Sequence, residues 1–463
     1  MKNALLIIAI LACISAGALA QSPPASINPS GVSTANENPD QPPMDEASVS
    51  SAGTSKLDLA DFLSTPTLWD LSPSDYIERS GEGLARGTFT DELVSGYIKN
   101  HDMITFSRQR LAECVFRLEN NKLKNIYLLF DYSESEKDLE RIAATHASLQ
   151  TEIAADLRSP GTPLNFTFPD KRTIQITEWN GSAARIRLYC NAQSSDGAYC
   201  SALIERLDVP DTDMTQRLSA KKGYFDAHFS AAAADAADRI VDIPMRHQLP
   251  GIGACWSATL TRQMDFLGSE IEPQMMAQMV QGNEDKLLQE TGVKLGIYAK
   301  RYSFFTKQAA RENAVSLLKE YNALAAAAGA DAINYRDDGR KLVYGDNFIN
   351  MDNSVLAQIA IADAEKYALF RDVVIAAINH GLPVGWEVQR WAPLVNIKAP
   401  GHRRMIVGYD LKRDQLVFSD SWGLKYERRT MSFRAGYAMT VRLEIICPDW
   451  IPATEFPADL AIK

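Results

Sequence analysis

The chain has 463 residues, enough for two or three domains, each with a hydrophobic core of its own. Its composition is that of an ordinary globular protein, with 46% hydrophobic and 23% charged residues. The formal net charge of −10 argues against a surface for phosphate backbones, because proteins that bind nucleic acid concentrate Lys and Arg. Nucleic acid is therefore not expected as a partner.

The first twenty residues have the layout of a secretory signal. A basic start at Lys2 precedes an apolar run that ends in Ala18-Leu19-Ala20. We expect cleavage after Ala20 and a secreted or periplasmic protein; lipidation at Cys13 is the competing interpretation. No other segment approaches the roughly 20 apolar residues of a membrane span.

Residues 21–56 are rich in Pro, Ser, Asn and Gly and predict a disordered linker. Residues 57–230 then predict a separate N-terminal α+β domain. Within it we expect helices over 91–119 and 135–157 and strands over 125–130, 173–179 and 184–190. Asn180-Gly181, between the last two strands, predicts a hairpin with a type I′ turn.

Five cysteines follow the signal, and an odd number in an exported protein suggests one free thiol and two bridges. Cys190 and Cys200 flank a polar turn, so we expect them to form a disulfide. If Cys255 is the free thiol, Cys114 and Cys447 are the only two cysteines left to form the second bridge, and nothing else supports their pairing. No Cys or His cluster has the spacing of a zinc site, and no cofactor is expected.

Cys255 and Trp256 follow the glycine-rich turn Pro250-Gly-Ile-Gly253 and open an apolar helix that we expect to continue to Leu267. The positive end of the helix dipole would favour a thiolate at Cys255. A buried structural cysteine is the alternative. Mostly helical sequence follows, notably at 307–328 and 354–379.

His402 lies 147 residues after Cys255 (402 − 255), at the head of an apolar strand. Met405 to Tyr409 and Leu416 to Phe418 flank a polar turn and predict a hairpin that brings Asp420 toward His402. A histidine can accept the thiol proton, and a carboxylate can orient the ring. Whether the two side chains share a face depends on a register that the sequence leaves open. His380 is the rival histidine, but a helix C-cap would also explain it.

These motifs resemble the papain-like cysteine peptidase superfamily, particularly its divergent bacterial branches, over residues 240–447. Cys255-Trp256 matches the nucleophile motif, and Asp420-Ser-Trp422-Gly matches the family's Asn-Ser-Trp-Gly, with Asp in place of Asn. The resemblance implies a two-lobed catalytic domain, one lobe helical and one of antiparallel strands, with a tail over 448–463. It also implies an oxyanion-hole role for Gln248, although six residues instead of five separate it from Cys255, and supporting roles for Trp256 and Trp422.

The expected function is an exported cysteine endopeptidase that acts on protein or peptide substrates through a Cys255 acyl-thioenzyme. Residues 57–230 would then be an inhibitory prodomain or an accessory domain. A second hypothesis keeps the acyl-enzyme and changes the reaction to that of an amidase, a peptidoglycan endopeptidase or a transglutaminase. A third is a non-catalytic secreted binding protein on the same scaffold.

Overall fold

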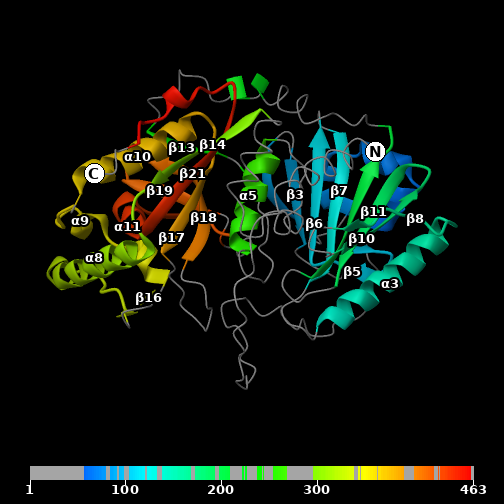
Figure 1. Cartoon of the computed structure of the whole chain (residues 1–463), viewed down its shortest axis with the longest axis horizontal. Coiled ribbons are helices and arrows are strands. Elements are labelled where there is room, and N and C mark those ends of the chain that lie inside the picture. The colour runs from blue at the N-terminus through cyan, green and yellow to red at the C-terminus, as the bar shows by residue number, and fades with distance from the viewer. Residues whose placement is uncertain are drawn as a thin grey trace, which may run out of the picture.

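The structure is a computed structural model. It describes residues 57–79, 84–90, 93–98, 104–119, 122–132, 138–167, 173–192, 198–208, 222–223, 225–226, 237–241, 243, 254–267, 296–337, 342–344, 346–361, 363–389, 401–421, 426 and 428–459. The described part combines helices with two large antiparallel sheets, which confirms the α+β class (Figure 1). None of the described helices is long and apolar enough to cross a membrane.

The N-terminal sheet has the strand order β2-β3-β6-β7-β12-β11-β10-β8, and β9 also pairs with β10. The helix α3 (Asp138–Asp156) packs against β7, β11 and β12 through a buried stripe that includes Ile142, Leu149 and Ile153. The strands are β2 (Leu84–Thr90), β3 (Leu93–Ile98), β6 (Glu113–Glu119), β7 (Lys122–Tyr132), β8 (Thr162–Pro163), β9 (Phe166–Thr167), β10 (Thr173–Asn180), β11 (Ala184–Asn191) and β12 (Tyr199–Arg206).

The prediction of a helix over 91–119 is wrong. This stretch forms the strands β3, β4 (Ile104–Phe106), β5 (Gln109–Arg110) and β6. Strand β4 also pairs in parallel with β1 (Leu57–Asp58). Ser107 and Arg108 both have positive φ, 46° and 67°, and form the tight turn between β4 and β5. The Asp58 carboxylate accepts hydrogen bonds from both of their backbone N–H groups. A partner 49 residues away thus stabilises this turn.

The hairpin of β10 and β11 is confirmed, but its turn is not type I′. Asn180 pairs with Arg185, and the Gly181 N–H donates to the Ala184 carbonyl at 2.8 Å. Neither Asn180 nor Gly181 has the positive φ that a type I′ turn requires. Glycine is needed at 181 for a different reason: a Cβ there would lie 2.3 Å from the Leu63 carbonyl oxygen.

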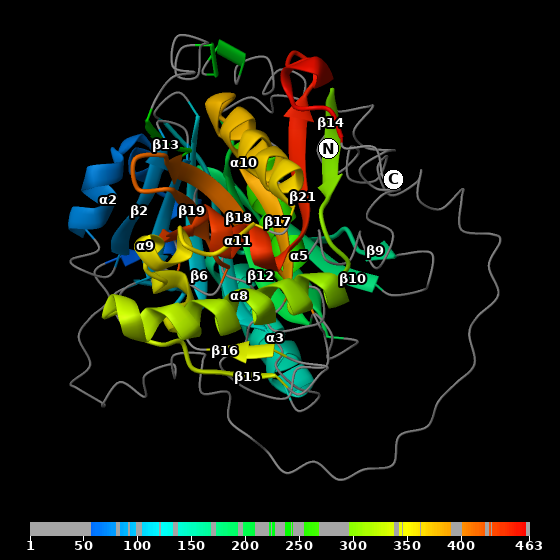
Figure 2. The same cartoon turned by 90° about the vertical axis from the view of Figure 1, so that its left-hand side faces the viewer.

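The C-terminal sheet has the order β14-β21-β17-β18-β19-β20, and β13 also pairs with β18. Its strands are β13 (Asp238–Ile240), β14 (Ile297–Ser303), β17 (Val384–Gln389), β18 (Gly401–Asp410), β19 (Gln415–Ser419), β20 (Arg429–Ser432) and β21 (Thr440–Pro448). The helix α8 (Lys307–Ala328) begins at the Thr306 cap and ends at Gly329, which has a φ of 68°. The second expected helix is split into α9 (Asn353–Leu356) and α10 (Ala364–Asn379), and α10 packs across β17 and β18 (Figure 2).

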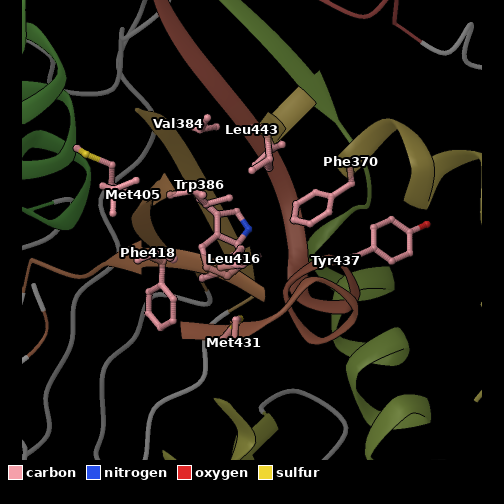
Figure 3. Close-up of a cluster of buried hydrophobic side chains, with 14 of the residues drawn as sticks. Phe370, Val384, Trp386, Met405, Leu416, Phe418, Met431, Tyr437 and Leu443 are labelled. Carbon is pink, nitrogen blue, oxygen red and sulfur yellow. The ribbon is translucent and has the colours of Figure 1, made fainter. Parts of the chain in front are cut away.

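Trp386 lies at the centre of the core between this sheet and its helices (Figure 3). Its indole N–H donates to Thr440 Oγ1 at 2.8 Å, and its ring packs edge-on against Phe418. The same hydrophobic cluster includes Leu260 of α5 (Ala254–Phe266), the helix that lies between the two sheets in Figure 1. It also includes Ile174 and Ile176 of β10, so apolar contacts continue between the two sheets.

Candidate active site

Cys255 is the second residue of α5, as the glycine turn and the following apolar pattern predicted. The helix is anchored by Leu260 and Met264, which are buried in the core. Thr259 Oγ1 donates to the Cys255 carbonyl at 2.7 Å. Cys255, a partly exposed residue, therefore lies in the first turn, where the positive end of the helix dipole favours a negative charge on its thiol.

The register of β18 against β19 decides where the predicted partners lie. Met405 pairs with Ser419. Continuing this register by one residue places Arg404 opposite Asp420, and His402, two residues further along β18, points to the same face. His402 and Asp420 therefore meet, which the sequence could not decide.

His402 Nε2 lies 2.8 Å from Asp420 Oδ1. The Asp420 N–H donates to the Tyr426 carbonyl at 2.9 Å, and this bond fixes the backbone beyond β19. Both side chains are almost completely buried, 5% exposed for His402 and 1% for Asp420. With Nε2 committed to the carboxylate, Nδ1 is the ring nitrogen left for the Cys255 thiol, with which His402 also forms a hydrogen bond.

The three groups shift one another's pKa values. Burial opposes the charged form of the His402 ring, but the charges of Asp420 and Cys255 and their hydrogen bonds raise its pKa to about 9. Burial would raise the pKa of Cys255, but the imidazolium and hydrogen bonds from His402 and the Arg403 backbone lower it. The Asp420 pKa is lowered in the same way, against burial, by His402 and Arg404. The arrangement thus favours a thiolate–imidazolium pair beside an ionised carboxylate.

Arg404 is a site residue that the motif analysis missed. Its Nε donates to Asp420 Oδ2 at 2.8 Å, and its side chain is completely buried. The signal for it was present, since a residue two positions after His402 on a strand faces the same side.

A second buried ion cluster lies beside the nucleophile helix. Arg403 pairs with Glu444, which also pairs with Arg301, and the Arg403 guanidinium lies 5.2 Å from the centre of the Trp256 ring. Gly385 makes room for it, because a Cβ there would lie 2.4 Å from Arg403 Nη2. This contact holds Trp256 in place next to Cys255.

Two predicted site residues, Gln248 and Trp422, lie outside the described residues. His380 caps the C-terminus of α10 and pairs with Glu455 at 3.7 Å, in agreement with its structural interpretation. Within the described ranges, no group of three or more His, Cys, Asp or Glu side chains could hold a metal ion.

The disulfide expected between Cys190 and Cys200 is not formed. The two residues are opposite one another on β11 and β12, but both are free and buried thiols. The Cys114–Cys447 pairing is not formed either, because the two free thiols belong to different hydrophobic clusters.

Residues 240–444 match the model of the Peptidase_C39 like family. No curated protein and no solved structure matches the chain. The matched segment contains Cys255, His402 and Asp420 and coincides with the segment in which the motifs predicted a papain-like peptidase. Residues 240–444 are thus similar to a family of papain-like cysteine peptidases, in agreement with the resemblance of their motifs.

Proposed function

We propose that the protein is a cysteine endopeptidase in which Cys255 is the nucleophile, His402 the acid and base, and Asp420 the orienting residue. The observation that carries the proposal is the buried contact of His402 with Asp420 at 2.8 Å, together with the interaction of the same imidazole with a thiol in the first turn of α5. The family match of residues 240–444 supports the reaction class.

In the first half of the reaction, the Cys255 thiolate attacks the carbonyl carbon of a peptide bond. A bond forms between Sγ and this carbon, and the carbonyl oxygen becomes an oxyanion. The Cys255 N–H, in the first turn of α5, and the Gln248 amide are the proposed donors to that oxyanion. The C–N bond then breaks as the His402 imidazolium transfers its proton to the leaving amine.

In the second half, neutral His402 removes a proton from water, and the water oxygen attacks the thioester. The C–S bond breaks, which restores the thiolate and releases the acid product. Asp420 stabilises the imidazolium each time it forms and keeps Nδ1 directed at the reacting atoms.

Export with cleavage after Ala20, and regulation by residues 57–230, belong to this proposal. The shared cluster of Ile174 and Ile176 with Leu260 supports a lasting association of the N-terminal sheet with the catalytic region. A regulatory role would then act through contacts with α5 and need not require release of the N-terminal part.

The test is labelling of the purified protein with a thiol-directed epoxide peptidase inhibitor, followed by peptide mapping by mass spectrometry. We expect fast labelling confined to Cys255 and loss of that labelling in His402→Ala. His380→Ala is the control, because it removes a histidine that caps α10, and it should change the labelling little. Slow labelling that is indifferent to His402 would reject the catalytic pair and favour a binding scaffold.

A peptide library incubated with and without a primary amine then separates the reaction types. Hydrolysed peptides support an endopeptidase. Transfer of the acyl group to the added amine, or release of ammonia from side-chain amides only, would reject it in favour of acyl transfer or amidase activity.

A further inference from the structure

The Asp420 carboxylate divides its two oxygens between two cations. Oδ1 faces His402 Nε2 and Oδ2 accepts from Arg404 Nε, each at 2.8 Å. Arg404 is 0% exposed and Asp420 1% exposed, so bulk water screens neither charge. A buried charge is tolerated only when an opposite charge and hydrogen bonds compensate for its lost hydration.

Aromatic rings hold the Arg404 guanidinium in place. Its central carbon lies 5.0 Å from the centre of the Phe418 ring and 6.0 Å from that of Trp386. Trp386 is fixed in turn by its hydrogen bond to Thr440. The planar guanidinium therefore meets Asp420 in one defined orientation, which an ammonium group on a flexible chain would not reproduce.

Within the group formed by Cys255, His402, Asp420 and Arg404, the charges sum to zero only if Arg404 is counted. The Cys255 thiolate and the His402 imidazolium sum to zero, and Arg404 cancels Asp420. The other nearby charges are engaged elsewhere: Arg403 and Arg301 pair with Glu444, and Arg262 of α5 donates to Ser419 Oγ at 2.9 Å.

We propose that Arg404 is a positioning residue of this site, which orients Asp420 and neutralises it so that the carboxylate can hold His402 without opposing the thiolate of Cys255. The inference rests on the proposed function only in taking Cys255 and His402 as the reacting pair.

The test is the rate of Cys255 alkylation by iodoacetamide as a function of pH, with the site of labelling mapped in each variant. Arg404→Met leaves one negative charge uncompensated, which should raise the pKa values of both Cys255 and His402. Both steps of the rate–pH profile, the lower one from Cys255 and the upper one from His402, should therefore move upward by about one pH unit, with roughly tenfold slower labelling on the acid side. Asp420→Asn leaves the positive charge of Arg404 uncompensated and should move both steps of the profile to lower pH. The double variant R404M/D420N should return to within a few tenths of a unit of wild type.

Arg413→Met is the matched control, because this arginine lies in the turn of the same hairpin and is 76% exposed; its profile should not move. Arg404→Lys keeps the charge and should recover most of the pH profile. Thermal unfolding of each variant identifies loss of fold. The double variant contains no unpaired buried charge, so its comparison with D420N measures the effect of Arg404 even where R404M does not fold.

Opposite shifts that cancel in the double variant support the proposal. Shifts in the same direction, or a double variant no closer to wild type than the single ones, would overturn it and leave Arg404 a purely structural residue. Failure of the proposed function is a separate result, in which wild-type Cys255 reacts as an ordinary thiol. The opposite shifts of the Cys255 titration in R404M and D420N would still test the role of Arg404.

Discussion

Replacing Glu444 by Gln tests the buried ion cluster beneath the nucleophile helix. The Glu444 side chain is 1% exposed and lies between Arg403 and Arg301, and Arg403 in turn packs against Trp256. Gln has nearly the same shape as Glu, so the substitution removes the negative charge with little change in packing. The buried guanidinium group of Arg403 and the partly buried one of Arg301 then lose their charged partner.

The magnitude follows from the pKa of Glu444. Burial opposes ionisation, but Arg403 and Arg301 outweigh it and lower the pKa to about 2 from the ordinary 4.5. The gap between these values corresponds to about 3 kcal/mol of stability at neutral pH. Since the folded-state pKa is the lower one, this contribution is complete above about pH 4.5 and is lost as the pH falls from there through about 2.

The assay is urea unfolding of wild type and Glu444→Gln, followed by tryptophan fluorescence at pH 7 and at pH 3. We expect the variant to be about 3 kcal/mol less stable at pH 7 and the difference to shrink clearly at pH 3. Glu312→Gln is the control, because Glu312 is 55% exposed on α8 and should change stability little at either pH. An equal loss at both pH values would refute the electrostatic reasoning, and no loss at pH 7 would refute the importance of the pair.

Three further predictions concern the core and the site. Gly385→Ala should lower the free energy of unfolding by about 1–3 kcal/mol, because its Cβ would displace the Arg403 guanidinium; unchanged urea unfolding would show that Arg403 moves freely. Ile174→Ala should lower the free energy of unfolding by about 2–5 kcal/mol and make the Cys255 region more sensitive to limited proteolysis. Leu207→Ala is the control, because Leu207 is 48% exposed, and it should do neither. Unchanged proteolysis of Ile174→Ala would contradict a core shared by the two sheets. Finally, kcat/KM for a peptide substrate should fall above about pH 9, because the raised pKa of His402 keeps the ring protonated below that value and the leaving amine needs its proton; a fall centred near pH 6.5 would contradict the ion pair.

Local sequence determined the elements that present the site. A glycine-rich turn followed by apolar residues at helical spacing predicted the start of α5 within one residue. Two apolar runs around a polar turn predicted the hairpin of β18 and β19 that carries His402 and Asp420. These signals were reliable because helix starts and hairpin turns depend on residues close together in the chain.

The strands over 91–119 were decided by the tertiary structure. Polar residues in β6 interrupt the alternation expected of a strand, and Glu113 to Phe116 are buried on both faces of the sheet. The turn that precedes them depends on Asp58, far away in the sequence. Pairing with distant strands therefore outweighed the local helical pattern.

The same reason limits what could be known of the site. The sequence by itself determined which thiol, imidazole and carboxylate were candidates, because their residue types and local contexts are readable. Only the tertiary structure decided that they meet and that Arg404 and Glu444 complete the charges around them. Strand register and buried ion pairs depend on which residues lie opposite one another across β17, β18, β19 and β21, and a shift of one residue would have moved each side chain to the other face.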